Sequence, residues 1–261
     1  MRIETARTDQ TDVVRYLKID VVRNALDLWY LERKDRRHKL YICFSDDQII
    51  GHLGIYDTPE AVYANLGGEM RAAEELLHLI PTKRAAITTT KELGALIMRS
   101  ISYDVVYFND IMLVNRGEEK LRNPDKAIRL SSKNAVQYSS FGSSFNVPTS
   151  LPIDWINECL ERDLTYGVFA DDGTLASVAS LTGWHDQVSV IMGVETKPEF
   201  RHKGFGAACV SAAVRAGLER SNSCSLFVRA DNDVAIKLYE ALGFKKIGEE
   251  LWIDIGSGLI P

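Results

Sequence analysis

A short basic segment, residues 201–207, has the composition of an anion-binding loop. An apolar stretch at residues 188–194 precedes it, and apolar residues at helical spacing follow it over residues 206–220. Glycines allow backbone N–H groups to approach an anion closely, and a helix N-terminus adds unpaired N–H groups and a partial positive charge. The predicted ligand is therefore a phosphate or pyrophosphate. The basic and glycine residues that support this prediction are Arg201, Lys203, Gly204 and Gly206.

Two common phosphate-binding motifs do not fit this segment. A Rossmann fingerprint needs a third glycine where this chain has Cys209, and here the basic residues precede the glycines. A P-loop needs Gly-Lys-Ser/Thr, whereas Ala207 and Ala208 follow Gly206. The order that fits is Arg-x-x-Gly-x-Gly, directly after the Thr-x-Pro-Glu-Phe of residues 196–200.

A second segment, residues 226–244, contains the pattern Asn-x-x-Ala-x-x-Leu-Tyr-x-x-x-Gly-Phe, which starts at Asn232. An apolar strand is predicted before Asn232, a helix after it, and Gly243-Phe244 at the end of that helix. The two segments together resemble motif A and motif B of the GCN5-related N-acetyltransferases (GNAT), in the order and at the separation found in that superfamily. The resemblance covers about the last half of the chain.

The resemblance implies that acetyl-coenzyme A (acetyl-CoA) is the cofactor and that no metal is needed. In this superfamily the motif A loop holds the pyrophosphate. The strand before the loop splays from its neighbour near a bulge, so its backbone can pair with the pantetheine amides. The cofactor-binding residues implied by the resemblance are Val194, Glu195, Thr196, Arg201, His202, Lys203, Gly204, Phe205, Gly206, Ala207, Asn232, Ala235 and Tyr239.

The resemblance also places Tyr239 near the sulfur of the cofactor as a general acid. A tyrosine with an ordinary pKa is protonated at neutral pH and can donate a proton to a leaving thiolate. The group that removes the proton from the amine is left open, because Phe227 stands where some relatives have a glutamate. Glu195 on the motif A strand, His185 in the preceding loop and water are the alternatives.

The function that follows is transfer of an acetyl (acyl) group from acetyl-CoA to a primary amine, by direct attack in a ternary complex. The acceptor is expected to be a small molecule or a protein N-terminus, held by loops around residues 141–151 and 184–187. The alternatives are a catalytically weak module that binds or senses acyl-CoA, and an interaction scaffold that binds no cofactor. The missing obvious base keeps the first alternative open.

Composition limits the remaining classes of function. Of the 261 residues, 46% are hydrophobic, which is sufficient for a core. The net charge of −5 argues against a general nucleic-acid binder. No apolar run is long enough to span a membrane, and the first residues lack the core of a signal peptide. The four cysteines form no metal-binding or disulfide pattern, so free thiols in the cytoplasm are expected.

The order of predicted strands and helices occurs twice. This predicts a tandem of two α/β domains with mixed sheets, both GNAT-like: a degenerate N-terminal domain at 1–120 and an acetyl-CoA-binding domain at 126–261. The first domain has Gly67-Gly68-Glu69 where the second has its basic loop, and an acid at that place would repel phosphate. A helix at 12–31 is predicted to break midway, and a strand at 246–255 is predicted to close the sheet of the second domain.

Overall fold

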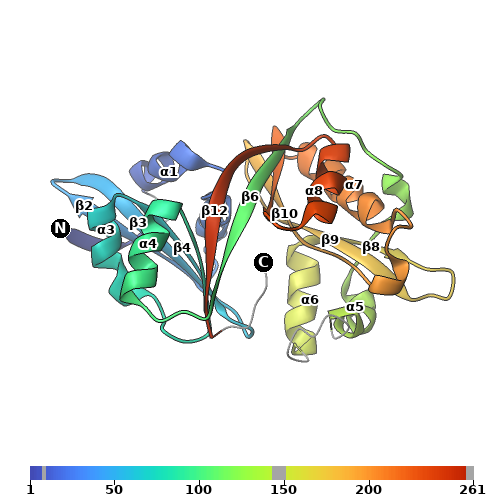
Figure 1. Cartoon of the computed structure of the whole chain (residues 1–261), viewed down its shortest axis with the longest axis horizontal. Coiled ribbons are helices and arrows are strands. Elements are labelled where there is room, and N and C mark those ends of the chain that lie inside the picture. The colour runs from blue at the N-terminus through green and yellow to red at the C-terminus, as the bar shows by residue number, and fades with distance from the viewer. Residues whose placement is uncertain (8–9, 143–150, 257–261) are drawn as a thin grey trace. The chain divides into compact units, whose positions relative to one another are not determined.

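A computed structural model describes residues 1–7, 10–142 and 151–256, and it divides the chain into two compact units (Figure 1). Unit 1 consists of Met1–Asp110, Arg229–Asp231 and Gly248–Pro261. Unit 2 consists of Ile111–Val228 and Asn232–Ile247. Residues 143–150, which belong to one of the loops predicted to hold the acceptor, lie outside the described residues.

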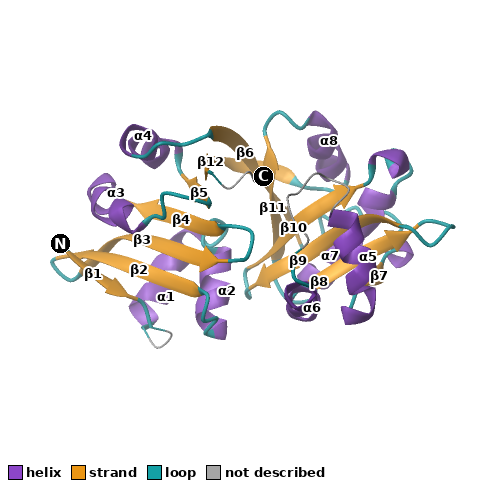
Figure 2. Ribbon diagram, turned by 90° about the horizontal axis from the view of Figure 1, so that it is seen from below, coloured by secondary structure: helices purple, strands orange, loops and turns teal. Residues whose placement is uncertain are grey.

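Unit 1 contains a mixed sheet with the strand order β1-β2-β3-β4-β5-β12, in which β4 and β5 are parallel (Figure 2). A 3-10 turn separates α1 from α2, so the predicted break in the first helix is confirmed. Its elements are β1 (Arg2–Thr5), α1 (Thr11–Leu17), α2 (Ala25–Arg33), β2 (His38–Ser45), β3 (Gln48–Asp57), β4 (Val62–Gly68), α3 (Met70–Leu76), β5 (Ala85–Thr89), α4 (Lys91–Ser100), and parts of β6 (Val105–Asn115) and β12 (Lys245–Ile255).

Unit 2 has the strand order β11-β10-β9-β8-β7, in which β10 and β11 are parallel. Polar residues after β6 lead into a 3-10 turn at Pro124–Lys126. The other elements of the unit are β7 (Ile128–Arg129), α5 (Ala135–Gly142), α6 (Ile153–Arg162), β8 (Leu164–Phe169), β9 (Leu175–Trp184), β10 (Val188–Thr196), α7 (Phe205–Leu218), β11 (Ser223–Arg229) and α8 (Asp233–Ala241).

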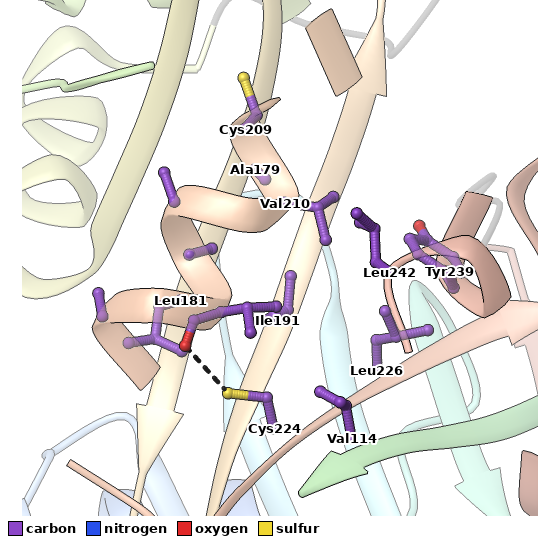
Figure 3. Close-up of a cluster of buried hydrophobic side chains, with 14 of the residues drawn as sticks. Val114, Ala179, Leu181, Ile191, Cys209, Val210, Cys224, Leu226, Tyr239 and Leu242 are labelled. Atoms are coloured by element: carbon purple, nitrogen blue, oxygen red, sulfur yellow. Dashed lines mark hydrogen bonds between the residues drawn. The ribbon is translucent and has the colours of Figure 1, made fainter. Parts of the chain in front are cut away.

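Helix α7 is the centre of the larger core of unit 2. Eleven of its fourteen residues are buried, which is why apolar and small residues cover most of its circumference instead of one stripe. Strands β9, β10 and β11 supply the facing residues Leu181, Ile191 and Leu226, and α8 adds Tyr239 (Figure 3). This packing holds α7 and α8 in one hydrophobic core with β9, β10 and β11.

The last strand, β12, corrects one prediction. Its residues 248–255 belong to unit 1, where Leu251 to Ile255 pair antiparallel with β5, from Thr89 back to Ala85. They do not close the sheet of the second half, so the predicted division at residues 1–120 and 126–261 differs from the observed units there. The reason is packing, because Leu251, Ile253 and Ile255 lie in the core that α3 and α4 cover.

Glu250 on β12 is a buried carboxyl group, and the Asn109 amide donates a hydrogen bond to it, with the Asn109 Nδ2 3.3 Å from the Glu250 Oε1. Burial raises the pKa of Glu250 to about 7, and the hydrogen bond from Asn109 offsets only part of that rise. The unfolded chain would release this proton near pH 4.5. The folded state therefore binds more protons between pH 4.5 and 7, and unit 1 loses stability as the pH rises through that window.

We expect Glu250→Gln to remove this loss, because glutamine keeps the acceptor for Asn109 and cannot ionise. At pH 8 the variant should be more stable than the wild type by on the order of 3 kcal/mol, and near pH 4.5 the two should be similar. Urea unfolding at both pH values measures this difference. The control is Glu249→Gln, since Glu249 is a partly exposed neighbour that pairs with Lys91. Equal pH dependence in wild type and Glu250→Gln would contradict the prediction.

Candidate functional site

The parallel strands β10 and β11 separate halfway along their length. They pair only from Val188 with Ser223 to Ile191 with Leu226, although β10 continues to Thr196 and β11 to Arg229. The edge of β10 beyond Ile191 therefore has unpaired backbone groups that face the gap between the strands. In unit 1 the corresponding strands β4 and β5 pair up to Thr89, the last residue of β5.

A bulge lies on β10 at this separation. Met192 pairs with Ser180 and Glu195 with Val178 on β9, so β10 takes three steps where β9 takes two, and one residue is extra. Gly193 occupies the left-handed region with φ of 57°, which favours glycine because it lacks a Cβ atom. The bulge redirects the strand just before it enters the basic loop.

The loop after β10 presents a continuous run of unpaired donors. A 3-10 turn at Pro198–Phe200 is followed by His202 and Gly204, both with positive φ, and α7 begins at Phe205. The N–H groups of residues 202–207 have no hydrogen-bond partner among the described residues. Successive N–H groups in such a turn, together with a helix N-terminus, form a concave site for an anion.

The loop side chains add positive charge around these donors. The Arg201 Nε donates to the Thr196 carbonyl oxygen at 3.2 Å, and neither terminal nitrogen of its guanidinium has a partner in the described part of the chain. The Lys203 ammonium lies 5.0 Å from the centre of the Phe200 ring, a cation–π contact. Arg201, His202 and Lys203 are exposed, so all three can reach a ligand.

Gly206 brings the first turn of α7 close to the end of β10. A Cβ atom at this position would lie 3.0 Å from the Thr196 Oγ1 and 3.8 Å from a methyl group of Leu238 on α8. The first of these distances is tighter than an ordinary contact, so glycine allows the first turn of α7 to lie close to Thr196 at the end of β10, and Leu238 on α8 lies beside it. The two predicted motifs are therefore adjacent in the structure.

Asn232 caps the N-terminus of helix α8, and its side-chain oxygen accepts a hydrogen bond from the N–H of Ala235 at 3.2 Å. The Tyr239 ring is buried and packs edge to face against Phe244, with the ring centres 5.9 Å apart. Burial raises the pKa of Tyr239 well above its ordinary value, so the hydroxyl stays protonated at any physiological pH. The hydroxyl has no hydrogen-bond partner among the residues that the structure describes.

The two protein groups considered as the base lie in different places. Glu195 is half-buried at the end of the bulge, next to the open edge of β10. His185 precedes β10, where its imidazole pairs with Asp186 and its backbone N–H donates to the Val188 carbonyl at 2.9 Å. Val188 and Gly193 are five positions apart along the strand, about 17 Å. His185 is therefore at the other end of the strand and is not part of the site.

One residue near the loop was missed by the sequence analysis. Ser177 on β9 is fully buried, and its hydroxyl contacts the end of β10. No motif contains it, and a serine in an apolar strand has no distinctive spacing. It could have been found only by knowing which β9 residue lies beside Thr196.

Comparison with known proteins shows which fold the chain has. Residues 165–253 match the family model described as FR47-like protein. A Drosophila protein of known structure is 13% identical, with a TM-score of 0.74, over 97% of this chain and 99% of the other. A tandem GNAT protein from the clavulanic acid biosynthesis pathway is 12% identical, with a TM-score of 0.58, over 97% and 96% of the two chains.

This is a tandem GNAT fold. A putative GNAT-family acetyltransferase from Novosphingobium aromaticivorans is similar as well, with 16% identity and a TM-score of 0.61 over 88% of this chain and 95% of the other. No curated protein matches the sequence. The predicted fold class and the GNAT resemblance are therefore confirmed, with the FR47-like region in the second half of the chain.

Within this tandem GNAT fold, the loop before α3 in unit 1 differs in charge from the loop before α7 in unit 2, and the helix that follows it is shorter. Glu69 precedes α3 and pairs with Arg71 at 2.9 Å, and α3 has seven residues against the fourteen of α7. We expect Glu69→Lys to leave acetyl-CoA affinity within about twofold, because unit 1 lacks the basic loop. The matched reversal in unit 2, Lys203→Glu, should weaken binding.

Calorimetry on both charge-reversal variants tests whether unit 1 takes part. If a folded Glu69→Lys protein lost its affinity for acetyl-CoA, unit 1 would hold cofactor and would not be a degenerate copy. Among the described residues, no group of three or more His, Cys, Asp or Glu could hold a metal ion, and no helix is long and apolar enough to cross a membrane.

Proposed function

We propose that the chain is an acetyl-CoA-dependent N-acyltransferase that transfers an acetyl (acyl) group to a primary amine. The observation that carries this proposal is the run of six unpaired N–H groups at residues 202–207, between a splayed strand and a long buried helix. This run fits a pyrophosphate, and the unpaired edge of β10 fits a chain with amide groups, as coenzyme A has. No other loop between strand and helix in the described residues combines these features with two cationic side chains.

Each residue has a stated role in the proposed reaction. Bound acetyl-CoA would supply an acyl group activated as a thioester. Residues 202–207 bind the diphosphate through backbone N–H groups, and Arg201 adds a charge-assisted contact. The β10 edge orients the ligand and can donate an N–H where negative charge develops on the carbonyl oxygen. Tyr239 donates a proton to the leaving sulfur, and Glu195, directly or through water, accepts the proton that the amine loses.

A specific observation supports Tyr239 in this role. Burial raises its pKa, so the hydroxyl is protonated and available as a donor at neutral pH, although the same shift makes it a weaker acid. The ring is fixed by Phe244 and by the α7 core, so its hydroxyl can be held in one position. Preorganised donors of this kind contribute more than mobile ones, because they lose little freedom when the reaction occurs.

Two measurements test the proposal. Calorimetry should show that the purified chain binds acetyl-CoA, and release of free thiol in the presence of a panel of amines should show turnover. Amino acids, polyamines and a peptide with a free N-terminus cover the expected acceptors. Binding without turnover on any amine would favour the alternative, a module that binds or senses acyl-CoA. No binding at all would contradict both. A cytoplasmic location stays a prediction.

A further inference from the structure

Ser177 is a fully buried serine on β9 that lies under the proposed pyrophosphate loop. Its hydroxyl donates to the Glu195 carbonyl oxygen at 2.9 Å and lies 2.8 Å from the Thr196 hydroxyl. A serine hydroxyl has one proton to donate, and here it is donated to the Glu195 carbonyl oxygen. The Thr196 hydroxyl must therefore donate to Ser177. One side chain thus fixes two consecutive residues at the end of β10.

The same two residues connect directly to the anion site. The Thr196 carbonyl oxygen accepts a hydrogen bond from the Arg201 Nε at 3.2 Å. The Thr196 hydroxyl oxygen would lie 3.0 Å from a Cβ atom placed on Gly206, so it is close to the first turn of α7. The N–H of Lys197 donates to the Ala176 carbonyl at 3.0 Å, which ties the next residue to β9 as well. The connection therefore runs from β9 through the end of β10 to the guanidinium and to the first turn of α7.

Strand β10 needs such an anchor at this place. Beyond Ile191 it has lost β11 on one side, and the bulge at Gly193 interrupts its ladder with β9 on the other. Backbone held on one side by an interrupted ladder is the part of a sheet that opens most easily. The Ser177 contacts reinforce the ladder with β9 where it resumes at Glu195 and Thr196, just before the loop.

We propose that Ser177 is a positioning residue for cofactor binding: it holds Thr196 so that Arg201 and the N-terminal turn of α7 converge on the pyrophosphate. The inference rests on the proposed function, since it assigns a role in the same site. Ser177 touches no ligand group itself and acts through Thr196. Its effect should therefore fall on cofactor affinity and not on the chemical step.

The chain offers a matched control on the next strand. Ser189 on β10 is also fully buried, and its hydroxyl contacts the Gly217 carbonyl at 3.3 Å and the Ser221 hydroxyl at 2.7 Å. These partners are at the last turn of α7 and just after it, away from the loop. Ser189→Ala and Ser177→Ala remove the same group from the same core, so a purely structural role would give both variants the same result.

The experiment measures the Kd of acetyl-CoA by calorimetry, KM and kcat with an accepted amine, and the melting temperature. Ser177→Ala is expected to raise Kd and KM about 5- to 10-fold and to change kcat by less than about twofold, as expected for a loss of one buried hydrogen-bonded partner. Ser189→Ala should lower the melting temperature to a similar extent and leave Kd unchanged. In the Arg201→Ala background, Ser177→Ala should add little, because the two act through one connection.

Thr196 provides a second pair of variants if Ser177→Ala does not fold. Thr196→Val removes the hydroxyl at constant shape and should raise Kd, while Thr196→Ser keeps the hydroxyl and should not. Unchanged Kd in Ser177→Ala, equal losses in the two serine variants, or additive effects with Arg201→Ala would each overturn the inference. Wild-type protein that binds no acetyl-CoA would instead overturn the proposed function, and the inference with it.

Discussion

Tyr239→Phe is expected to lower kcat by about 10²- to 10⁴-fold, the range typical of lost general acid catalysis. Phenylalanine keeps the ring, and therefore the contact with Phe244 and the packing in the α7 core. It removes only the hydroxyl, which has no hydrogen-bond partner in the described chain, so no buried group is left unsatisfied. The Kd of acetyl-CoA and the melting temperature should therefore change little.

The control for Tyr239→Phe is Tyr166→Phe on β8 of the same unit. Burial also raises the pKa of Tyr166, but this residue packs at the far side of the core, on the strand next to β9 and away from β10. Steady-state rates with one amine acceptor compare the two variants. If Tyr239→Phe kept a rate near that of the wild type, Tyr239 would be a core aromatic and the sulfur would take its proton from water.

Arg201→Ala is expected to weaken acetyl-CoA binding by about 10- to 100-fold, because a charge-assisted hydrogen bond contributes roughly 1.5–3 kcal/mol. The two terminal guanidinium nitrogens have no partner within the described residues, so the side chain loses no existing contact when it binds an anion. The loss should be larger at low salt, where screening is weakest. Calorimetry at two ionic strengths measures both effects.

Arg215→Ala removes the same charge from the last turn of α7 and serves as the control. Arg215 is exposed and pairs with Asp125 at 2.7 Å. Arg215 lies ten residues after Phe205 along α7, about 15 Å and nearly two Debye lengths at physiological salt, so this substitution should change the affinity little. Equal affinity of Arg201→Ala and wild-type protein would remove the main support for a pyrophosphate at this loop.

Local patterns in the sequence were enough to predict most of the site. The loop at residues 201–207 and the helix that starts after Asn232 were predicted because turn glycines, basic side chains and a capping asparagine act over a few residues. The repeat of elements was predictable for the same reason, since each strand and helix has its own periodicity. Whether these residues bind cofactor stays a prediction.

What could not be predicted depends on contacts between residues distant in sequence. Residues 248–255 alternate like any half-buried strand, and nothing in that pattern says that β5 is their partner. Ser177 lies nineteen positions before Thr196, and only the pairing of β9 with β10 brings their hydroxyls together. His185 illustrates the reverse case: it is close to the motif A strand in sequence, yet it lies at the opposite end of that strand.

The position of β12 has a consequence for how the protein is made. A ribosome synthesises residues 1–110 first, but the sheet of unit 1 also needs residues 248–255, which emerge after all of unit 2. Until then β5 is an edge strand with a row of unpaired backbone groups, which invites pairing with other nascent chains. We therefore expect the usual order, in which the N-terminal domain folds first, to be reversed here. A chain that stalls late in translation would therefore carry a finished second half and an aggregation-prone first half.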